Sequence, residues 1–215
     1  MTILKDVFAN LSKKFSENSN LIDELWSEIE TNYSIKKRHY HTLAHIENLL
    51  LQLNEIKYEI NDWDTILFTL FYHDVVYNAL KNDNEDRSAD FARMRLKKLS
   101  VPELQIENCA NQIIATKKHL LSLDNDTNYF LDADLSILGA DWKTYLTYAQ
   151  QVRREYAIYP DLIYKPGRKK VLQHFLQMDR IFKTEHLFQK FEMQAKLNLQ
   201  HELTILNKAF LKKIE

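Results

Sequence analysis

Glycine, proline and cysteine are scarce in this sequence. Its 215 residues include two glycines and three prolines, so it has few of the turn signals that hairpins, β-sandwiches and glycine-rich nucleotide loops require. This scarcity favours long helices. The single cysteine, Cys109, excludes an internal disulfide and a thiolate metal site, which fits a reducing compartment. We therefore expect an all-helical fold.

A large net charge and long apolar runs are also absent. The formal net charge is −1, so no overall electrostatic attraction to nucleic acid or acidic lipid is expected, and any anion binding must be local. The first fifteen residues mix apolar and charged side chains instead of forming a signal sequence, and no later run approaches the length of a membrane span. We expect a cytoplasmic protein that binds neither membranes nor nucleic acid polymers; the oligomeric state is not predicted.

The composition is that of an ordinary globular protein. Hydrophobic residues make up 45% and charged residues 27% of the chain, which is enough apolar surface for a substantial core. No internal repeat, low-complexity tract or interdomain linker interrupts the sequence. We therefore expect one domain over residues 1–215.

Apolar residues recur at helical spacing along most of the chain. The segment Thr65–Tyr77 is apolar around most of its circumference, which predicts a central, buried helix starting near Asp64. Polar or turn-like stretches at residues 78–86 and 159–168 are expected to be loops. The other predicted helices cover Leu21–Asn32, Leu43–Leu53, Ser88–Leu99, Glu103–Lys118, Tyr129–Leu138, Trp142–Tyr156, Lys169–Phe182 and His186–Leu211.

Histidines and aspartates occur at positions where a simple core would use apolar residues. On a helix, His41 and His45 would lie on one face, one turn apart, where they could share metal binding and proton transfer or serve only a structural role. His73 and Asp74 occur within the apolar sequence LFTLFYHDVVY, where burial is costly unless hydrogen bonds or a cation compensate.

Two further carboxylates, Asp132 and Asp134, occur among apolar residues in FLDADLSIL. Unpaired charge would be penalised there too. Imidazoles and carboxylates together form a nitrogen and oxygen ligand set that suits a divalent metal ion with open positions for water and substrate. Mn, Fe, Zn, Ni, Co and Mg all remain candidates.

The order of these groups, His, then His-Asp, then Asp, resembles the HD superfamily of metal-dependent phosphohydrolases. The segments RHYHTLAHI, FYHDVVYNALKNDNEDRSA, IIATKKH, FLDADLSILG, VRREY, YKPGRKKVL and IFKTEHLF resemble successive blocks of its bacterial subgroup of predicted metal-dependent HD phosphohydrolases. The resemblance implies a helical bundle with a metal-binding core at about residues 36–140 and a C-terminal helical extension at about residues 141–215. The implied metal ligands are His45, His73, Asp74 and Asp134, with Asp132 as the alternative to Asp134.

The sequence YHTLAH also resembles the Tyr-His-x-x-x-His element of cyclic-nucleotide phosphodiesterases, in which the first histidine protonates the leaving oxygen. This likeness implies that His41 is a general acid, and a surface or capping role is the alternative. Two other residues, Glu85 and His119, are further catalytic candidates. Glu85 could orient water or bind a second metal ion, or form a capping salt bridge.

Three cations are candidates for binding substrate phosphate: Arg87 in the polar stretch after His73-Asp74, Lys117 in IIATKKH, and Arg168 in YKPGRKK. Arginine suits bidentate contact with phosphate oxygens. For each cation, a solvated helix face or helix end is the alternative interpretation.

The first functional hypothesis is a metal-dependent phosphohydrolase that acts on a nucleotide or another small phosphorylated metabolite. Whether it is a phosphomonoesterase, a phosphodiesterase or a pyrophosphohydrolase stays open. The second hypothesis is an HD sensor or regulatory protein that binds a metal ion and a ligand without turnover. A third, a purely helical interaction module, predicts no stoichiometric metal.

Overall fold

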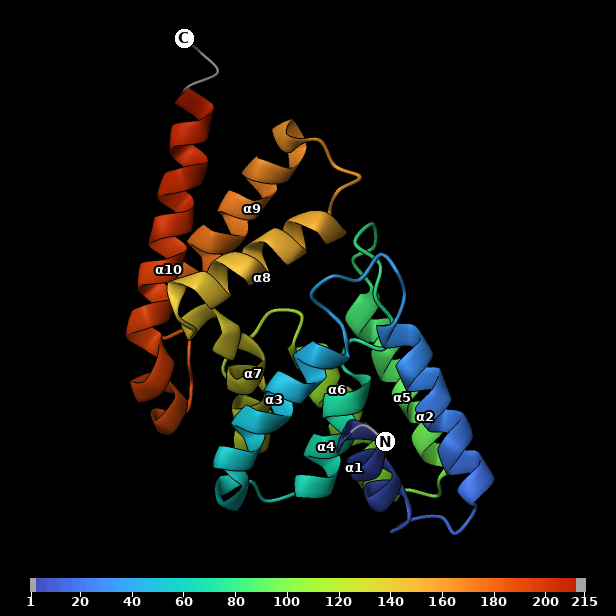
Figure 1. Cartoon of the computed structure of the whole chain (residues 1–215). Coiled ribbons are helices and arrows are strands. Elements are labelled where there is room, and N and C mark those ends of the chain that lie inside the picture. Colours follow the sequence, from blue (N-terminus) through green and yellow to red (C-terminus); the bar gives the residue numbers. More distant parts are fainter. Residues whose placement is uncertain (1–2, 212–215) are drawn as a thin grey trace. The chain divides into compact units, whose positions relative to one another are not determined.

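The chain folds into helices, as the sequence predicts. The computed structural model describes the backbone of residues 3–211 and the side chains of residues 3–207, and within this range it contains α- and 3₁₀-helices and no strand (Figure 1). The helices are α1 (Ile3–Ser12), α2 (Ser19–Tyr33), α3 (Leu43–Glu55), η1 (Lys57–Glu59), α4 (Trp63–Tyr72), α5 (Asn84–Lys98), α6 (Glu103–Ala115), α7 (Asn125–Leu135), η2 (Ser136–Gly139), α8 (Trp142–Glu155), α9 (Asp161–Leu176) and α10 (Glu185–Leu211).

The packing divides the chain into two compact units. The first ends at Leu131 and the second begins at Asp132, so the boundary falls inside α7. The His-rich and His-Asp motifs lie in the first unit, and Asp132 and Asp134 lie in the second. One domain over residues 1–215 stays a prediction.

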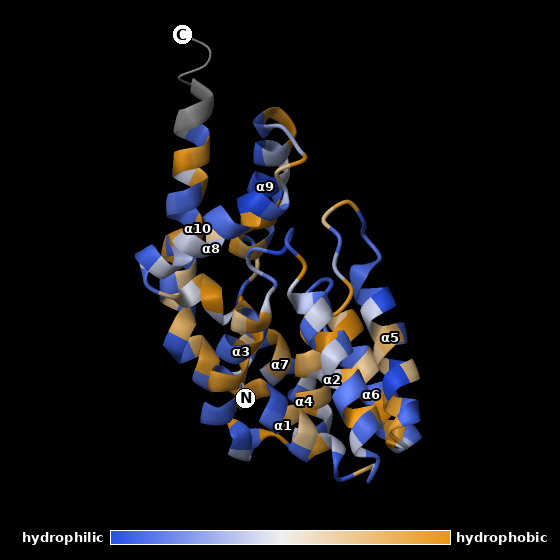
Figure 2. Ribbon diagram, turned by 45° about the vertical axis from the view of Figure 1, so that its right-hand side comes forward, coloured by the Kyte–Doolittle hydropathy of each residue, from blue (hydrophilic) through white to orange (hydrophobic). Residues whose placement is uncertain are grey.

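Helix α4 is the centre of the first unit. Every residue from Thr65 to Tyr72 is buried, and α4 packs against α1, α3, α5 and α6. A helix that is apolar on all sides requires such neighbours, and its hydrophobic residues can be followed in Figure 2. The predicted central, buried helix is therefore confirmed.

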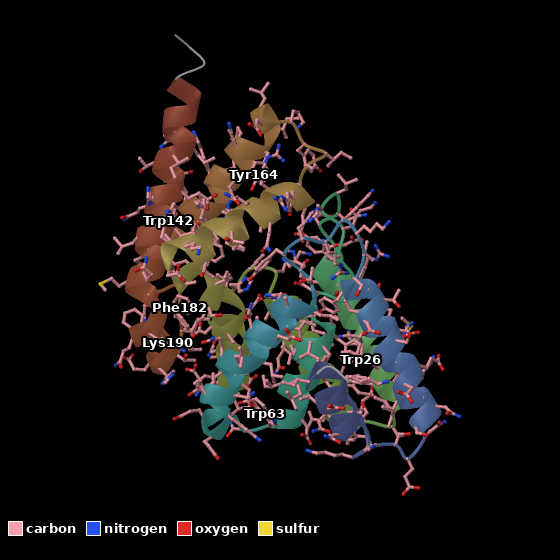
Figure 3. The ribbon with its side chains drawn as sticks, viewed as in Figure 1. Trp26, Trp63, Trp142, Tyr164, Phe182 and Lys190 are labelled. Carbon is pink, nitrogen blue, oxygen red and sulfur yellow. The ribbon has the colours of Figure 1, made fainter. Side chains whose placement is uncertain are left out.

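Helix α1 was not predicted, although its sequence carries an apolar stripe. Leu4, Phe8 and Leu11 recur at helical spacing and are buried. The Phe8 ring lies 5.2 Å from the ring of Phe71 on α4 and 6.0 Å from that of Trp26 on α2. Trp26 is labelled in Figure 3. These edge-to-face and tilted contacts join three helices in one aromatic cluster.

The predicted limits of α4 were wrong at both ends. The residue at the N-cap is Asp62, not Asp64: its carboxylate accepts hydrogen bonds from the backbone N–H and the hydroxyl of Thr65. The helix ends at Tyr72 instead of Tyr77, so His73 and Asp74 lie immediately after it. The backbone beyond it is held by distant groups; for example, Ser88 Oγ accepts from the Val76 N–H and donates to the Val76 carbonyl.

Helix α5 begins at Asn84, four residues before the predicted start. The Asn84 side chain accepts a hydrogen bond from the Asn78 N–H and donates to the Asn78 carbonyl, which closes the preceding loop. Glu85 and Asp86 then occupy the first helical turn, where the helix dipole favours acidic residues. Glu85 and Arg87 therefore belong to α5 and not to a polar loop.

The second unit contains the end of α7, η2 and helices α8, α9 and α10. Residues 159–168 were expected to form a loop, but α9 begins at Asp161 and continues through Pro166. Asp161 forms ion pairs with Arg153 and Lys165, both at 2.9 Å. These contacts favour a helical turn that Pro166 and Gly167 alone do not predict.

None of the helices in the described part of the chain combines the length and the apolar composition that a membrane span needs.

Candidate metal centre

The imidazole of His73 is held in one orientation. The residue directly follows α4, and its side chain is 1% exposed. Its Nδ1 lies 3.0 Å from the carbonyl oxygen of Leu70, which can only accept a hydrogen bond. Nδ1 must therefore carry a proton, and in the neutral ring Nε2 presents a lone pair. Metal-binding histidines commonly donate a hydrogen bond of this kind from the ring nitrogen that does not bind the metal.

His45 meets this lone pair from the first turn of α3. The side chain is 4% exposed, and its Nε2 lies 3.2 Å from the Nε2 of His73. Two ring nitrogens at this separation require a proton or a cation between them. Nitrogens that bind one zinc ion at about 2.1 Å are about 3.0 Å apart at a right angle and about 3.4 Å apart at the tetrahedral angle. The observed separation fits a shared cation.

Asp74 completes a group of three potential ligands. Its Oδ2 lies 3.3 Å from His73 Nε2, and its carboxylate is 18% exposed. One ligand atom from each of His45, His73 and Asp74 can be chosen so that all lie within 4.8 Å of one another. The group offers nitrogen and oxygen ligands, and its Asp74 side is partly exposed. These are the features expected of a site that holds a divalent ion open to water or substrate.

Arg38 and Tyr33, two residues without a predicted role, hold the backbone of Asp74. The guanidinium of Arg38 is buried and donates to the carbonyls of His41, Asp74 and Val75 at 3.3, 2.6 and 2.9 Å. The Tyr33 hydroxyl accepts a hydrogen bond from the Asp74 N–H at 3.2 Å. The signal available in the sequence was the arginine that opens RHYHTLAH.

His41 does not lie on a helix, which corrects the expected one-turn spacing from His45. Helix α3 begins at Leu43, with Thr42 at its N-cap. His41 nevertheless stays close to the group: its Nε2 lies 3.8 Å from Asp74 Oδ2. Its ring stacks on that of Tyr77 with 4.2 Å between centroids. The side chain is 20% exposed, so one part of the imidazole faces solvent.

The second unit surrounds Asp132 with hydrogen-bond donors and a lysine. Asp132 is fully buried and accepts hydrogen bonds from the N–H groups of Lys183 and Thr184 and from the Thr184 hydroxyl, at 2.7 to 2.8 Å. The Lys183 ammonium lies 3.7 Å from the same carboxylate. Burial raises the pKa of Asp132 above its ordinary value, and the donors from Thr184 and Lys183 offset only part of this rise.

The surroundings of Asp132 remove one reason to expect a metal ion at this carboxylate. Lys183 and the N–H groups before α10 are the polar partners of the buried Asp132 carboxylate, so its burial alone does not call for a metal ion. Asp134 is half-buried on the last turn of α7. Its choice over Asp132 as a ligand stays a prediction.

The remaining catalytic and substrate-binding candidates of the first unit lie on α5 or shortly after α6. Glu85 and Arg87 are in the first turn of α5, with Arg87 exposed. Lys117 forms an exposed ion pair with Asp86 at 2.7 Å, the solvated arrangement that was its alternative interpretation. His119 has a left-handed backbone with φ of 50° after the end of α6. Their catalytic and substrate-binding roles stay predictions.

Arg168, the third candidate cation, lies in a buried network of the second unit. Its Nε and Nη2 donate to the two carboxylate oxygens of Glu202 at 2.8 and 2.9 Å. The guanidinium also lies over the Tyr148 ring, 5.4 Å from its centroid. Glu202 accepts a further hydrogen bond from the Tyr145 hydroxyl. The group suited to phosphate is thus engaged with a carboxylate, and its role in substrate binding stays a prediction.

Comparisons with models of known protein families, with curated proteins and with solved structures each found no match.

Proposed function

We propose that this protein is a metal-dependent phosphohydrolase that acts on a nucleotide or another small phosphorylated metabolite. The observation that carries the proposal is the approach of His45 Nε2 to His73 Nε2 at 3.2 Å, with the other nitrogen of His73 bound to the Leu70 carbonyl. Buried imidazoles with facing nitrogens need a shared proton or cation. The adjacent Asp74 carboxylate favours the cation.

In this proposal His45, His73 and Asp74 hold a divalent ion, and Asp134 is the fourth ligand that the family resemblance implies. Such an ion supplies Lewis acidity toward water and toward phosphoryl oxygens. Arg38 and Tyr33 keep the Asp74 carboxylate in place through its backbone. The burial of both imidazoles limits competing water on that side of the group.

His41 is the proposed proton donor to the leaving oxygen. Its ring is near Asp74 and stacked on Tyr77, and part of it is exposed. An ordinary imidazole titrates near neutral pH, so it can deliver a proton to a departing alkoxide under physiological conditions. A small substrate fits the balanced charge of the chain, which gives no attraction to a polymer.

The experiment measures phosphate release by purified protein from a broad panel of nucleotides and phosphorylated metabolites, with each candidate metal supplied in turn. The proposal expects metal-dependent turnover of at least one substrate class. Turnover should be lost in His73→Ala and Asp74→Asn. It should be retained in the matched controls His174→Ala and Asp179→Asn, which replace the same residue types at exposed positions of the second unit.

Two outcomes would contradict the proposal. Metal and ligand binding without turnover anywhere on the panel would favour the sensor hypothesis. Turnover that persists in His73→Ala and Asp74→Asn would place the catalytic group elsewhere.

A further inference from the structure

The ring of Tyr77 lies against the imidazole of His41, the proposed proton donor. The two rings are stacked, with 4.2 Å between their centroids and 30° between their planes. Tyr40 meets the same imidazole edge-on, with 5.0 Å between centroids. His41 precedes α3 and is 20% exposed, so burial alone does not fix the orientation of its ring. The stacked ring of Tyr77 is a contact that can fix it.

The backbone on both sides of Tyr77 is held by side chains of α5. Ser88 Oγ accepts a hydrogen bond from the Val76 N–H and donates to the Val76 carbonyl. The Asn84 side chain binds both backbone groups of Asn78 in the same way. Both supporting side chains are buried, and buried polar groups with satisfied hydrogen bonds hold a defined geometry. Tyr77 is therefore fixed in place although it lies outside any helix.

Arg38 connects Tyr77 to the metal group. Its buried guanidinium lies 5.5 Å from the centroid of the Tyr77 ring. The same guanidinium donates to the backbone carbonyls of His41 and Asp74. One rigid, planar cation thus contacts the ring of Tyr77, the backbone of the proposed acid and the backbone of a proposed metal ligand. These shared contacts relate the position of Tyr77 to that of the metal group.

We propose that Tyr77 is a positioning residue that holds His41 in the orientation required for proton transfer. This inference rests on the proposed function. The proton passes from a ring nitrogen of His41 to the leaving oxygen as its bond to phosphorus breaks and the oxygen of water binds phosphorus. The acid must lie within about 2.6–3.2 Å of that oxygen, and a misplacement of about 1 Å can cost about a hundredfold in rate. Tyr77 transfers no proton and acts through His41.

The first test compares two esters of the phosphoryl compound that the substrate panel identifies. The para-nitrophenyl ester has a weakly basic leaving group, and the methyl ester has a strongly basic one. Tyr77→Leu removes the stacked ring and should slow turnover of the methyl ester about ten- to a hundredfold. It should slow the para-nitrophenyl ester less than about threefold, because that leaving group needs little protonation.

Two variants control for the loss of a tyrosine. Tyr77→Phe keeps an aromatic ring and should stay within about threefold of the wild type for both esters. Tyr58 lies in the first unit and is 99% exposed, so Tyr58→Leu should match the wild type. Thermal unfolding and metal content of each variant check that the fold and the metal group are retained.

Action through His41 also predicts that the two substitutions are not additive. His41→Ala protein has no acid left to position, so adding Tyr77→Leu should slow the methyl ester less than about threefold further. A residue that only stabilises the fold would produce the same additional loss in both backgrounds.

The contact between the two rings can be measured without turnover. Nuclear Overhauser effects between the ring protons of His41 and those of residue 77 should be present in the whole metal-free protein, in the wild type and in Tyr77→Phe. This measurement depends neither on a substrate nor on the folding of Tyr77→Leu. If these effects were missing in the wild type, the inference would be wrong.

A loss in Tyr77→Leu that depends on the leaving group, disappears in His41→Ala and is recovered in Tyr77→Phe supports the inference. Equal losses for both esters, or a loss in Tyr77→Phe as large as that in Tyr77→Leu, would overturn it. Normal turnover by both the wild type and Tyr77→Leu would overturn this inference alone and leave the proposed function intact. A wild type without any turnover would instead remove the proposed function, and the role of Tyr77 with it.

Discussion

His41 and His45 lie four residues apart but differ in their surroundings. His45 is buried, and its Nε2 faces the Nε2 of His73. His41 precedes the helix, is partly exposed, and its Nε2 lies 3.8 Å from the Asp74 carboxylate. The first environment suits a ligand, and the second suits a residue that exchanges protons with solvent and substrate.

This difference predicts a division of labour. His45→Ala should lose the metal, because a direct ligand is removed. His41→Ala should keep the metal and lose about a hundred- to ten-thousand-fold in turnover, the usual contribution of a general acid. The loss should be smaller for a substrate with a weakly basic leaving group. Metal content and hydrolysis of substrates with good and poor leaving groups check both variants.

A loss of metal in His41→Ala as complete as that in His45→Ala would make His41 a ligand. Unchanged metal content and rate in His41→Ala would make it a surface residue.

Arg38 is the second residue whose role can be isolated. Arg38→Lys retains a positive charge but cannot donate to three carbonyls in the planar arrangement of the guanidinium. The looser Asp74 backbone should weaken metal affinity about ten- to a hundredfold. Calorimetric titration with the preferred metal measures this, and the exposed Arg154→Lys serves as control. Wild-type metal affinity in folded Arg38→Lys protein would show that Arg38 only stabilises the fold.

At the scale of elements, the start of α4 depends on the carboxylate of Asp62. The sequence pattern had indicated Asp64, two residues later. Asp62 accepts from Thr65, and Gln105 on α6 donates to it as well. Asp64 instead forms a partly exposed ion pair with Lys14. Asp62→Ala should therefore cost about 1–2 kcal/mol of unfolding free energy, whereas Asp64→Ala should cost about 0.5 kcal/mol. Urea denaturation compares the two, and equal losses would contradict the assignment of the cap.

The cap at Asp62 also has a predicted pH dependence. Burial raises the pKa of Asp62, but the hydrogen bonds from Thr65 and Gln105 outweigh it and lower the pKa below its ordinary value. A lowered pKa in the folded protein contributes stability above the unfolded pKa of about 3.9 and loses it as the pH falls through the folded value. The stability difference between wild type and Asp62→Asn should therefore be constant near neutral pH and shrink below about pH 4. A difference that does not change over this range would contradict the ionised cap.

At the scale of the whole molecule, the sequence predicts the helical class and most of the helices but not how they end. An almost continuous apolar segment was enough to identify the buried α4, because burial on all sides favours apolar residues around the whole helix. The end of α4 at Tyr72 was not predictable locally, since Tyr33, Arg38 and Ser88 supply the hydrogen bonds that replace helical ones. Likewise, α9 continues through Pro166 where local propensity predicts a loop.

At the candidate site too, the sequence indicates the central residues but not the distant residues that support them. The apolar setting pointed to His73 and Asp74, and the family resemblance implied His45 as a further ligand; the structure brings these three side chains together. The supporting residues Arg38 and Tyr33 act across 36 and 41 positions of sequence, a separation over which helical periodicity carries no information. Lys183, which compensates Asp132, is 51 positions away from it for the same reason.

The central claim is that the paired imidazoles share a metal ion, and the metal content of purified protein tests it most directly. Protein prepared without a histidine tag and without chelator, then dialysed, should retain about one divalent ion per chain by elemental analysis, and His73→Ala should retain almost none. The control His174→Ala should match the wild type. The account would be contradicted if the wild-type protein bound no stoichiometric metal with any of the ions supplied, or if His73→Ala retained as much metal as the wild type. The two nitrogens would then be joined by a proton.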